Sequence, residues 1–507
     1  MKNNNRRAFI QKALLATGGA ALQACQTEPS YPPQSKPQRN STELPPSKPS
    51  STPLPDGLRE ENFHLHNPTP LALESLRNKV GMSPITSTNR LFVRNNLPRP
   101  SQDIITNADQ WELKITGVKN PSTISLPQLQ QLGIETVYAV LQCSGNGRAF
   151  FKHAPSGSPW ATGAAGCVQW TGVKLSTVFE VCGGIIPNMK YLTATGGEPL
   201  PEDVPRDKAI VERSIPIEKA LKDCILAWEL NGEPIPISHG GPLRLIVPGY
   251  FGCNQIKYVQ QVAATKEQSQ AKIQQSGYRF RPIGEKGNPS QPSMWRMPVK
   301  SWIVNASEDQ ARNLYSMHGV AFSGERGISS VEFSIDGENW KQAELYGIDL
   351  GSNAWRCFRF QTDPQIKPKQ VYTRATDALG DTQPKEHVEN ERGYGNNSWL
   401  DHAFILQENT QEKTQQDSVV ALSKEQQEKG RALFTKEAAP PCGTCHTLND
   451  AQTTAQIGPN LNQLQPTNER VQRAIENGVG AMPSYGQQLS QEDIKILSEY
   501  VAQSSKK

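Results

Sequence analysis

The sequence lacks any long hydrophobic run: outside the N-terminus, no apolar stretch approaches the roughly 18–20 residues needed to cross a bilayer. It also lacks a strong excess of charge, because 53 Lys and Arg residues face 49 Asp and Glu residues, for a net charge of +4. Without a basic excess or a nucleic-acid-binding motif, the composition argues against nucleic acid as a partner. No Gly-rich dinucleotide fingerprint follows a strand, which argues against a nicotinamide or flavin cofactor. We expect a chain that is soluble or merely anchored.

Clustered metal ligands are scarce as well. The eight histidines do not cluster, and of the nine cysteines only Cys442 and Cys445 form a close pair. A buried free thiol behaves as a small hydrophobic group. Five scattered cysteines without metal-ligand spacing are therefore expected to be mostly buried thiols: Cys167, Cys182, Cys224, Cys253 and Cys357.

The N-terminus has the layout of an export signal over residues 1–25. Arg6 and Arg7 precede Phe9, and a short apolar stretch follows at residues 13–24. Paired arginines at this place resemble a twin-arginine (Tat) signal, which exports folded proteins. The alternative is an ordinary export signal that happens to contain two arginines.

The signal ends in a sequence that resembles a lipoprotein cleavage box. Residues 22–25 read Leu-Gln-Ala-Cys, so Cys25 would become the lipidated first residue of the mature chain. Residues 26–57 are rich in Pro and Ser and contain few large apolar side chains, a composition that cannot offset its ordering entropy by burial. We expect them to be a flexible tether between the anchor and the folded domains.

Near the C-terminus, Cys442, Cys445 and His446 form a C-x-x-C-H motif. This spacing allows two thiols to hold a haem while the adjacent imidazole binds its iron. A redox dithiol or half of a zinc site would show a similar pattern, so the surrounding sequence has to decide.

Helices are predicted on both sides of the motif. Ser423 and Gln426 form a capping box that opens a helix extending to Phe434, and residues 490–502 show the apolar periodicity of a second helix. Between them, Met482 offers a thioether for the sixth position of a haem iron, with a core methionine as the alternative.

This order of elements resembles a small class I cytochrome c over about residues 420–507. The resemblance implies a covalently bound haem c that is attached through Cys442 and Cys445. Its iron would be bound by His446 and Met482.

A second redox centre is expected upstream, because a fused cytochrome usually accepts electrons from a partner centre or donates electrons to it. The strand-like residues 137–142 end at Cys143, which opens the Gly-containing stretch of residues 143–148. A single soft thiolate at a strand end could bind a heavy metal whose other ligands come from an organic cofactor. By itself, the pattern is more typical of a buried structural cysteine before a turn.

Residues 141–148, Leu-Gln-Cys-Ser-Gly-Asn-Gly-Arg, resemble the molybdenum-ligand loop of the sulfite oxidase family. Similarity to this family extends over about residues 58–405 and implies a pterin-bound molybdenum with Cys143 as its only protein ligand. Further motifs occur in the family's order at residues 92–98, 160–164, 170–173, 214–217, 227–232, 239–244, 247–249 and 256–257.

The family's substrate pocket implies roles for five residues of this chain. Its arginines would bind a small oxyanion such as sulfite, because planar guanidinium groups match its oxygens with charge-assisted hydrogen bonds. Taken singly, each arginine is more typical of a solvated surface charge, and only the set together favours a binding pocket. The expected catalytic residues are Arg94, Arg148, Trp160, Tyr278 and Arg392.

The family also implies a set of cofactor-binding residues. His239, Arg244 and Lys257 would hold the phosphate end of the pterin, although His239 could also be a satisfied loop histidine. Asn96 lies at the cofactor where many members have a histidine. Three other positions that are often basic are uncharged here: Gly147, Asn254 and Gln255. These departures lower the positive charge near the cofactor.

The fold class implied is multidomain. It combines an α+β molybdopterin domain of the sulfite oxidase type, an all-β immunoglobulin-like sandwich for dimerisation and an all-α cytochrome c domain. For the sandwich, Val331, Phe333 and Ile335 alternate with polar neighbours as in a strand. The expected boundaries are 1–25 signal peptide, 26–57 linker, 58–288 molybdopterin domain, 289–406 sandwich, 407–421 linker and 422–507 cytochrome.

Together these resemblances predict a sulfite dehydrogenase on the periplasmic side of a bacterial membrane, with a homodimer formed through the sandwich. Electrons from sulfite would pass from molybdenum through the haem, one at a time, to an external cytochrome c or other acceptor. One alternative is a molybdenum reductase of nitrate or S-oxides that is fed by the haem. Another is a non-enzymatic, anchored electron carrier.

Overall fold

The computed structural model describes residues 54–309, 311–312, 314–363, 365–366, 368–406, 422–479 and 482–506. The expected signal peptide with Cys25, residues 26–53 of the tether and the linker 407–421 lie outside the described residues. Within the described ranges, no helix is long and apolar enough to cross a membrane.

The first folded domain is an α+β domain built on three sheets, and all its strand pairs are antiparallel except β13 with β4. The small sheet contains β1 (Phe63–Asn67), β2 (Ala72–Ser75) and β3 (Val93–Arg94). A second contains β6 (Glu135–Gln142), β7 (Ala165–Lys174), β10 (Ile225–Leu230), β11 (Glu233–Pro234) and β12 (Arg244–Ile246). The third contains β4 (Glu112–Thr116), β5 (Ser122–Ser125), β8 (Tyr191–Gly196), β9 (Glu212–Pro216) and β13 (Val259–Thr265).

Short helices connect these strands. They are α1 (Asp103–Thr106), α2 (Leu126–Gln130), α3 (Leu175–Val181), α4 (Arg206–Ala209) and α5 (Ile217–Asp223). The capping box of Ser125 and Gln128 opens α2, since each side chain accepts a hydrogen bond from the other residue's backbone amide. Leu175 and Phe179 of α3 are fully buried, so the helix joins the core that the sheets enclose.

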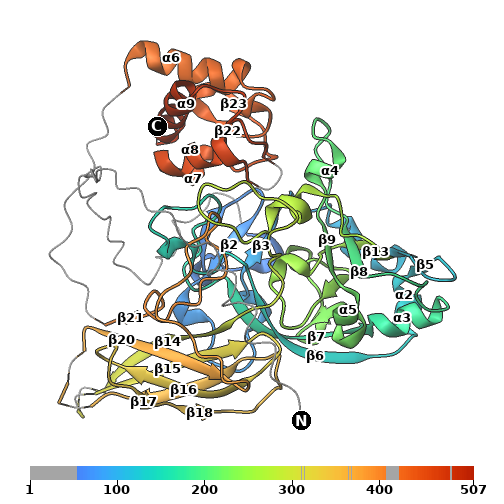
Figure 1. The fold of residues 1–507 in the computed structure, drawn as a ribbon, viewed down its shortest axis with the longest axis vertical. Coiled ribbons are helices and arrows are strands. Elements are labelled where there is room, and N and C mark those ends of the chain that lie inside the picture. The colour runs from blue at the N-terminus through green and yellow to red at the C-terminus, as the bar shows by residue number, and fades with distance from the viewer. Residues whose placement is uncertain are drawn as a thin grey trace, which may run out of the picture. The chain divides into compact units, whose positions relative to one another are not determined.

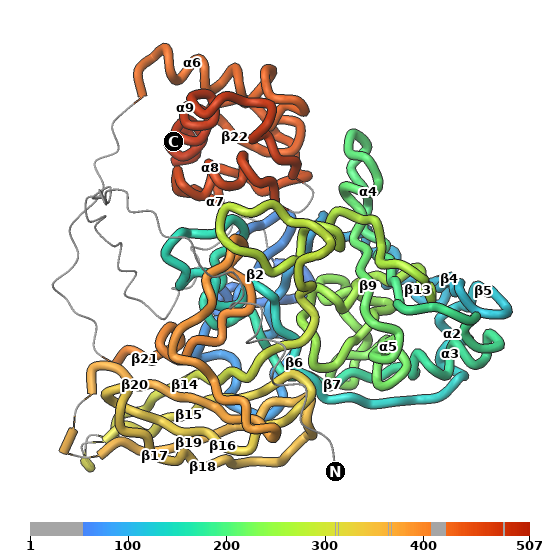
Figure 2. The backbone as a smooth tube through the Cα atoms, viewed as in Figure 1, coloured from blue at the N-terminus to red at the C-terminus, as the bar shows by residue number. Residues whose placement is uncertain are grey.

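Strands β6 and β7 determine where the Cys143 loop lies. Figure 2 shows the two strands running side by side, and their register pairs Val137 with Trp170 and Gln142 with Ala165. The backbone N–H of Cys143 continues this ladder with a 2.9 Å hydrogen bond to the Ala164 carbonyl. The predicted strand 137–142 therefore exists and delivers Cys143 at its C-terminal end.

The second domain is the predicted β-sandwich, whose two sheets appear as yellow and orange arrows in Figure 1. One sheet has the order β14 (Val299–Asp309), β15 (Leu314–Ser323), β19 (Arg356–Gln361), β18 (Glu344–Tyr346). The other has the order β17 (Lys341–Gln342), β16 (Ile328–Ser334), β20 (Gln370–Asp377), β21 (Phe404–Ile405). Met317 and Phe358 of the first sheet share one core with Val331 and Val371 of the second.

The C-terminal domain is helical, with α6 (Lys424–Ala432), α7 (Leu461–Leu464), α8 (Asn468–Asn477) and α9 (Gln491–Ser504) (Figure 1). Its only strands among the described residues are the short pair β22 (Thr447–Leu448) and β23 (Thr453–Thr454). The capping box of Ser423 and Gln426 is present at α6, which confirms that prediction. On α9, Ile494, Leu497 and Tyr500 are buried in the domain core, as their spacing predicts.

Candidate active site

The Cys143 loop is held from both sides. The Asn146 side chain donates to Gln142 Oε1 at 3.1 Å and accepts from the Ala164 N–H at 3.1 Å. Gly147 has a φ of +96°, and a Cβ there would lie only 2.8 Å from the Asn396 Cβ, so a larger residue would strain the turn. These restraints fix the Cys143 thiol, 9% exposed, at the wall of two cavities.

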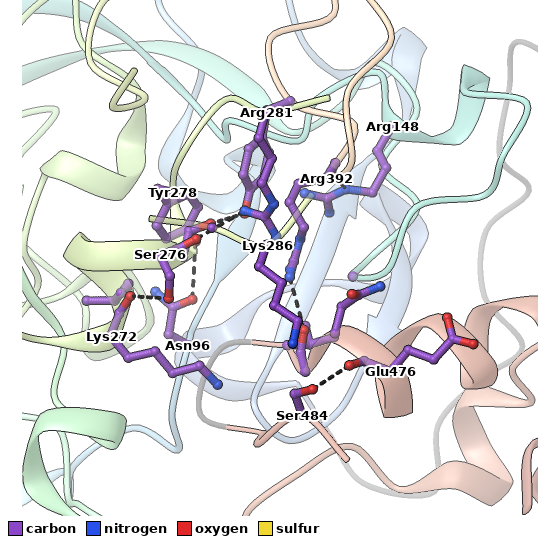
Figure 3. Close-up of a pocket in the computed structure, with 18 of the residues that line it drawn as sticks. Asn96, Arg148, Lys272, Ser276, Tyr278, Arg281, Lys286, Arg392, Glu476 and Ser484 are labelled. Carbon is purple, nitrogen blue, oxygen red and sulfur yellow. Dashed lines mark hydrogen bonds between the residues drawn. The ribbon is translucent and has the colours of Figure 1, made fainter. Parts of the chain in front are cut away.

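The first cavity, of about 350 Å³, brings together most of the predicted pocket residues (Figure 3). The predicted residues that line it are Arg94, Asn96, Cys143, Arg148, Tyr278 and Arg392. Within the described part of the chain, no carboxylate lies within ion-pair distance of its three predicted arginines. The cavity is therefore strongly positive and suits an anion.

Arg148 and Arg392 are linked to each other. Arg148 Nε donates to the Arg392 carbonyl at 2.8 Å, and Arg148 Nη1 donates to the Ser158 carbonyl at 2.8 Å. Burial lowers the pKa of Arg148, and the neighbouring Tyr394 and Cys143 oppose this shift. Arg392 Nε is buried with no partner in the described structure, so it remains able to donate to a bound anion.

Tyr278 enters the cavity directly after the turn Ile273–Gly277. Its ring stacks on Tyr394 with centroids 5.4 Å apart, and its hydroxyl donates to Asn96 Oδ1 at 3.3 Å. Burial raises the pKa of Tyr278, so it stays a protonated hydrogen-bond donor near neutral pH.

Trp160 lies behind the cavity wall rather than among the residues that line it. It is fully buried and makes edge-to-face contacts with His66 and Phe92. The buried Glu74 carboxylate accepts the backbone N–H of Ala161 at 2.9 Å and so fixes the segment that carries Trp160. Trp160 thus supports the segment next to the pocket, and its expected role in catalysis stays a prediction.

The second, narrower cavity collects the predicted cofactor-binding residues His239, Arg244 and Lys257 on one wall. Arg244 Nη1 donates to the His239 carbonyl at 2.6 Å, and Lys257 Nζ donates to Asn95 Oδ1 at 2.7 Å. Burial and the two neighbouring cations lower the pKa of His239, which favours the neutral imidazole. Burial, followed by the neighbouring Arg244, also lowers the pKa of Lys257.

This cationic wall fits the anionic end of a pterin cofactor. His239 Nε2, Arg244 Nε and Asn95 Nδ2 are buried with no hydrogen-bond partner in the described structure. A bound phosphate would satisfy such donors and offset the cost of burying adjacent cations. Asn96 lies at the junction, since it lines both this cavity and the arginine cavity.

The cytochrome motif surrounds a third, largely apolar cavity. Cys442, Cys445, His446 and Met482 all line it. His446 Nδ1 lies 2.9 Å from the Pro459 carbonyl, and an N–H donated there leaves Nε2 free for an iron. These residues therefore fit a covalently attached haem.

Replacing Met482 with alanine is expected to lower the haem reduction potential, because a thioether ligand raises it. The optical signature of sulfur–iron ligation should disappear as well. A redox titration followed by haem absorbance measures both effects. Met82→Ala, which removes an exposed methionine, should change neither. If the two variants have equal reduction potentials, Met482 is not a ligand of the haem iron.

The haem cavity and the arginine cavity share wall residues: Arg94, Asn96, Gly157, Ser158 and Val479. Hydrogen bonds between described residues connect the domains at this place. Arg392 Nη1 donates to the Gly478 carbonyl at 3.1 Å, and Lys272 Nζ donates to the Met482 carbonyl at 2.8 Å. Asn477 also donates to Glu391 Oε1 at 3.1 Å. No motif indicated these contacts, because they arise between domains.

Lys300 lies beneath the Cys143 loop, and sequence reasoning missed it. This residue of β14 is 1% exposed, and its Nζ donates to the Asn146 carbonyl at 3.3 Å. Burial lowers its pKa to about 7, although Asp401 and Glu74 oppose the shift. The available signal was a lysine at the same alternating positions of the strand as the apolar residues Trp302 and Val304.

The lowered pKa of Lys300 predicts a pH dependence of stability. Between about pH 7 and pH 10 the unfolded chain holds the proton more tightly than the folded chain, so the free energy of unfolding rises with pH. Lys300→Met should remove this rise, on the order of 3 kcal/mol, and raise the melting temperature most at neutral pH. Calorimetry across this pH range tests it. The exposed Lys341→Met variant should keep the wild-type slope, and equal slopes in both variants would contradict the prediction.

Comparisons with known proteins agree with this architecture. Three family models match: "Oxidoreductase molybdopterin binding domain" over residues 97–273, "Mo-co oxidoreductase dimerisation domain" over 291–406, and "Cytochrome C oxidase, cbb3-type, subunit III" over 425–501. The expected fold class and both cofactors, a molybdopterin-bound molybdenum and haem c, are thereby confirmed.

Individual relatives cover about two thirds of the chain. Sulfite oxidase of Arabidopsis thaliana is 28% identical over 69% of this chain and 94% of its own length. Nitrate reductase [NAD(P)H] of Hordeum vulgare is also 28% identical, over 62% of this chain and 38% of its own length. The crystal structure of the sulfane dehydrogenase SoxCD from Paracoccus pantotrophus matches the fold with a TM-score of 0.56 and 23% identity, over 70% of this chain and 94% of that one.

Proposed function

Because this chain joins a molybdopterin domain of the sulfite oxidase family to a dimerisation domain and a cytochrome c domain, it is a molybdenum-dependent oxidoreductase, and we propose that it is a sulfite dehydrogenase. One observation carries the choice of substrate. The Cys143 thiol faces a cavity with three arginines, which have no carboxylate partner among the described residues. Such a cavity favours a small oxyanion over a neutral substrate.

The reaction consumes one water and releases two electrons and two protons when sulfite becomes sulfate. When bound, the cofactor supplies the oxygen transfer and accepts the electrons. Cys143 holds the metal, and Arg94, Arg148 and Arg392 bind and orient the anion. Tyr278 remains protonated; its hydroxyl donates to Asn96 Oδ1 in the structure and would donate to the anion once that is bound.

The shared wall supports a direct route for electrons to the haem. Arg94, Asn96 and Ser158 contribute to both cavities, so no further domain has to lie between the two centres. Arg392 serves both sides, because it lines the anion cavity and donates to the Gly478 carbonyl near Met482. The haem would then pass electrons singly to an external cytochrome.

A molybdenum reductase fed by the haem is the second candidate, and the similarity to a plant nitrate reductase favours it. The direction of electron transfer between molybdenum and haem distinguishes the two candidate functions. Purified protein with a dithionite-reduced haem, freed of excess reductant, should stay reduced when nitrate is added. Oxidised protein should be reduced by sulfite. Rapid oxidation of the haem by nitrate together with no reduction by sulfite would reverse the assignment.

We also place the enzyme on the periplasmic side of a bacterial membrane, with Tat export and a lipid anchor at Cys25. The Arg6–Arg7 pair and the sequence that ends at Cys25 support this proposal. The match of residues 291–406 to a dimerisation domain supports a homodimer formed through the sandwich. Cys25→Ser should release the enzyme from the membrane fraction of expressing cells, and retention there would contradict the anchor.

A further inference from the structure

Arg213, a residue of β9, is buried beneath the active site, with only 1% of its surface exposed. Its Nη1 donates to the Ile273 carbonyl at 3.0 Å. Its Nη2 donates to Asn254 Oδ1 at 3.1 Å and to Ser293 Oγ at 3.0 Å. The guanidinium thus joins three segments that are distant in the sequence.

The charge of Arg213 is not balanced by an acid. No carboxylate of the described chain lies within ion-pair distance, and its Nε is buried without a hydrogen-bond partner. Burial lowers its pKa, and the main opposing influences are Cys253 and Tyr278. An uncompensated buried charge destabilises the folded state by about 3–5 kcal/mol. Such a residue is expected where a bound group supplies the opposite charge.

Arg213 also contacts Tyr278 and Cys253, two residues that line the cavities at Cys143. Its guanidinium carbon lies 5.5 Å from the ring centroid of Tyr278, and its partner Ile273 begins the turn that leads into that tyrosine. On the other side, it interacts with Cys253, whose Sγ accepts a hydrogen bond from Ser144 Oγ at 3.3 Å. Ser144 directly follows Cys143, the expected metal ligand, so the cation lies close to the loop that would hold the metal.

The neighbours of Arg213 next to the cofactor cavity are uncharged. Asn254 and Gln255 are buried amides, and Cys253 and Gln255 line that cavity. The side chain of Asn254 is bonded directly to Arg213. We propose that Arg213 supplies from β9 the positive charge on this side of the cofactor site, offsetting the negative charge of the molybdenum–thiolate centre and positioning Tyr278.

This assignment predicts two effects of removing the charge. The reduced metal centre is more negative than the oxidised one, so loss of a nearby cation lowers the molybdenum midpoint potential. Loss of the Tyr278 support should lower kcat for sulfite by about 10–100-fold, as for other residues that support metal ligands. KM should change by less than about threefold, since Arg94, Arg148 and Arg392 are intact.

Moving the positive charge from position 213 to position 254 distinguishes an electrostatic role of Arg213 from a purely structural one. In Arg213→Ser/Asn254→Arg, an arginine at position 254 can occupy the space that Arg213 leaves, because the two side chains touch. The full-length enzyme is compared as wild type, Arg213→Ser, Arg213→Lys and the double variant. Arg77→Ser is the matched control, since Arg77 is also buried and donates to carbonyls such as that of Ile303.

The primary readout is the molybdenum midpoint potential, from a redox titration followed by electron paramagnetic resonance, with molybdenum content measured in parallel. Arg213→Ser should lower the potential. The double variant and Arg213→Lys should restore it towards wild type, and Arg77→Ser should leave it unchanged. If Arg213→Ser does not fold or does not bind molybdenum, the test depends on Arg213→Lys and the double variant, which both keep the positive charge. A potential in either of them that falls well below wild type would overturn the proposal.

The inference depends on the molybdenum cofactor and not on the identity of the substrate. The titration needs no sulfite, so a wild-type enzyme inactive with sulfite would contradict the proposed function while leaving this test valid. Equal potentials in Arg213→Ser and wild type, with only the melting temperature lowered, would assign Arg213 a purely structural role and overturn the proposal.

Discussion

Replacing Cys143 with serine is expected to lower sulfite-dependent haem reduction by about 1000-fold, or about 4 kcal/mol in activation free energy. Cys143 is the thiol at the wall of both the arginine cavity and the cofactor cavity. A hydroxyl is a poor replacement for a soft thiolate ligand. The haem spectrum should stay normal, because Cys442, Cys445 and His446 lie in another domain. Single-turnover absorbance measurements with excess sulfite test this.

The matched control is Cys253→Ser, which removes the other thiol that lines the cofactor cavity. It should retain activity within about tenfold of wild type, because a residue near the ligand has a smaller effect than the ligand itself. If both variants lose the same activity, the special role of Cys143 is refuted.

Arg148→Met is expected to raise KM for sulfite by about 100-fold and to lower kcat as well. Hydrogen bonds to a charged group contribute about 1.5–3 kcal/mol each, and one or two would be lost. The substitution also removes the 2.8 Å bond from Arg148 Nε to the Arg392 carbonyl, which loosens a second anion-binding residue. The measurement is steady-state kinetics with an external cytochrome c as acceptor.

Lys286→Met provides the control for charge alone, since Lys286 is exposed and lines the same cavity. Its KM should rise by no more than about threefold, because solvent screens an exposed charge. An equal rise in both variants would mean that the cavity attracts sulfite only by its overall potential.

Local sequence patterns were sufficient for much of this architecture. The alternation at Val331 and Phe333 identified a sandwich strand, and the Ser423 cap identified the first cytochrome helix. The strand before Cys143 was also predictable, because its β-branched and aromatic residues pair with β7. Each of these signals depends on neighbours within a few residues.

The contacts that assemble the site could not be read in this way. Arg213 and Asn254 are 41 residues apart, and Arg392 meets Gly478 across 86 residues, so no local pattern relates them. Trp160 was expected at the pocket, but whether it lines or supports the wall depends on how His66 packs against it. Such pairings follow from the tertiary fold.

The most direct test of the central claim is to mix oxidised enzyme that contains molybdenum and haem with sulfite in a stopped-flow instrument and follow haem absorbance. The proposed function predicts rapid haem reduction, with a rate that saturates as sulfite fills the arginine cavity. A haem that stays oxidised in fully molybdenum-loaded protein would contradict sulfite oxidation by this chain.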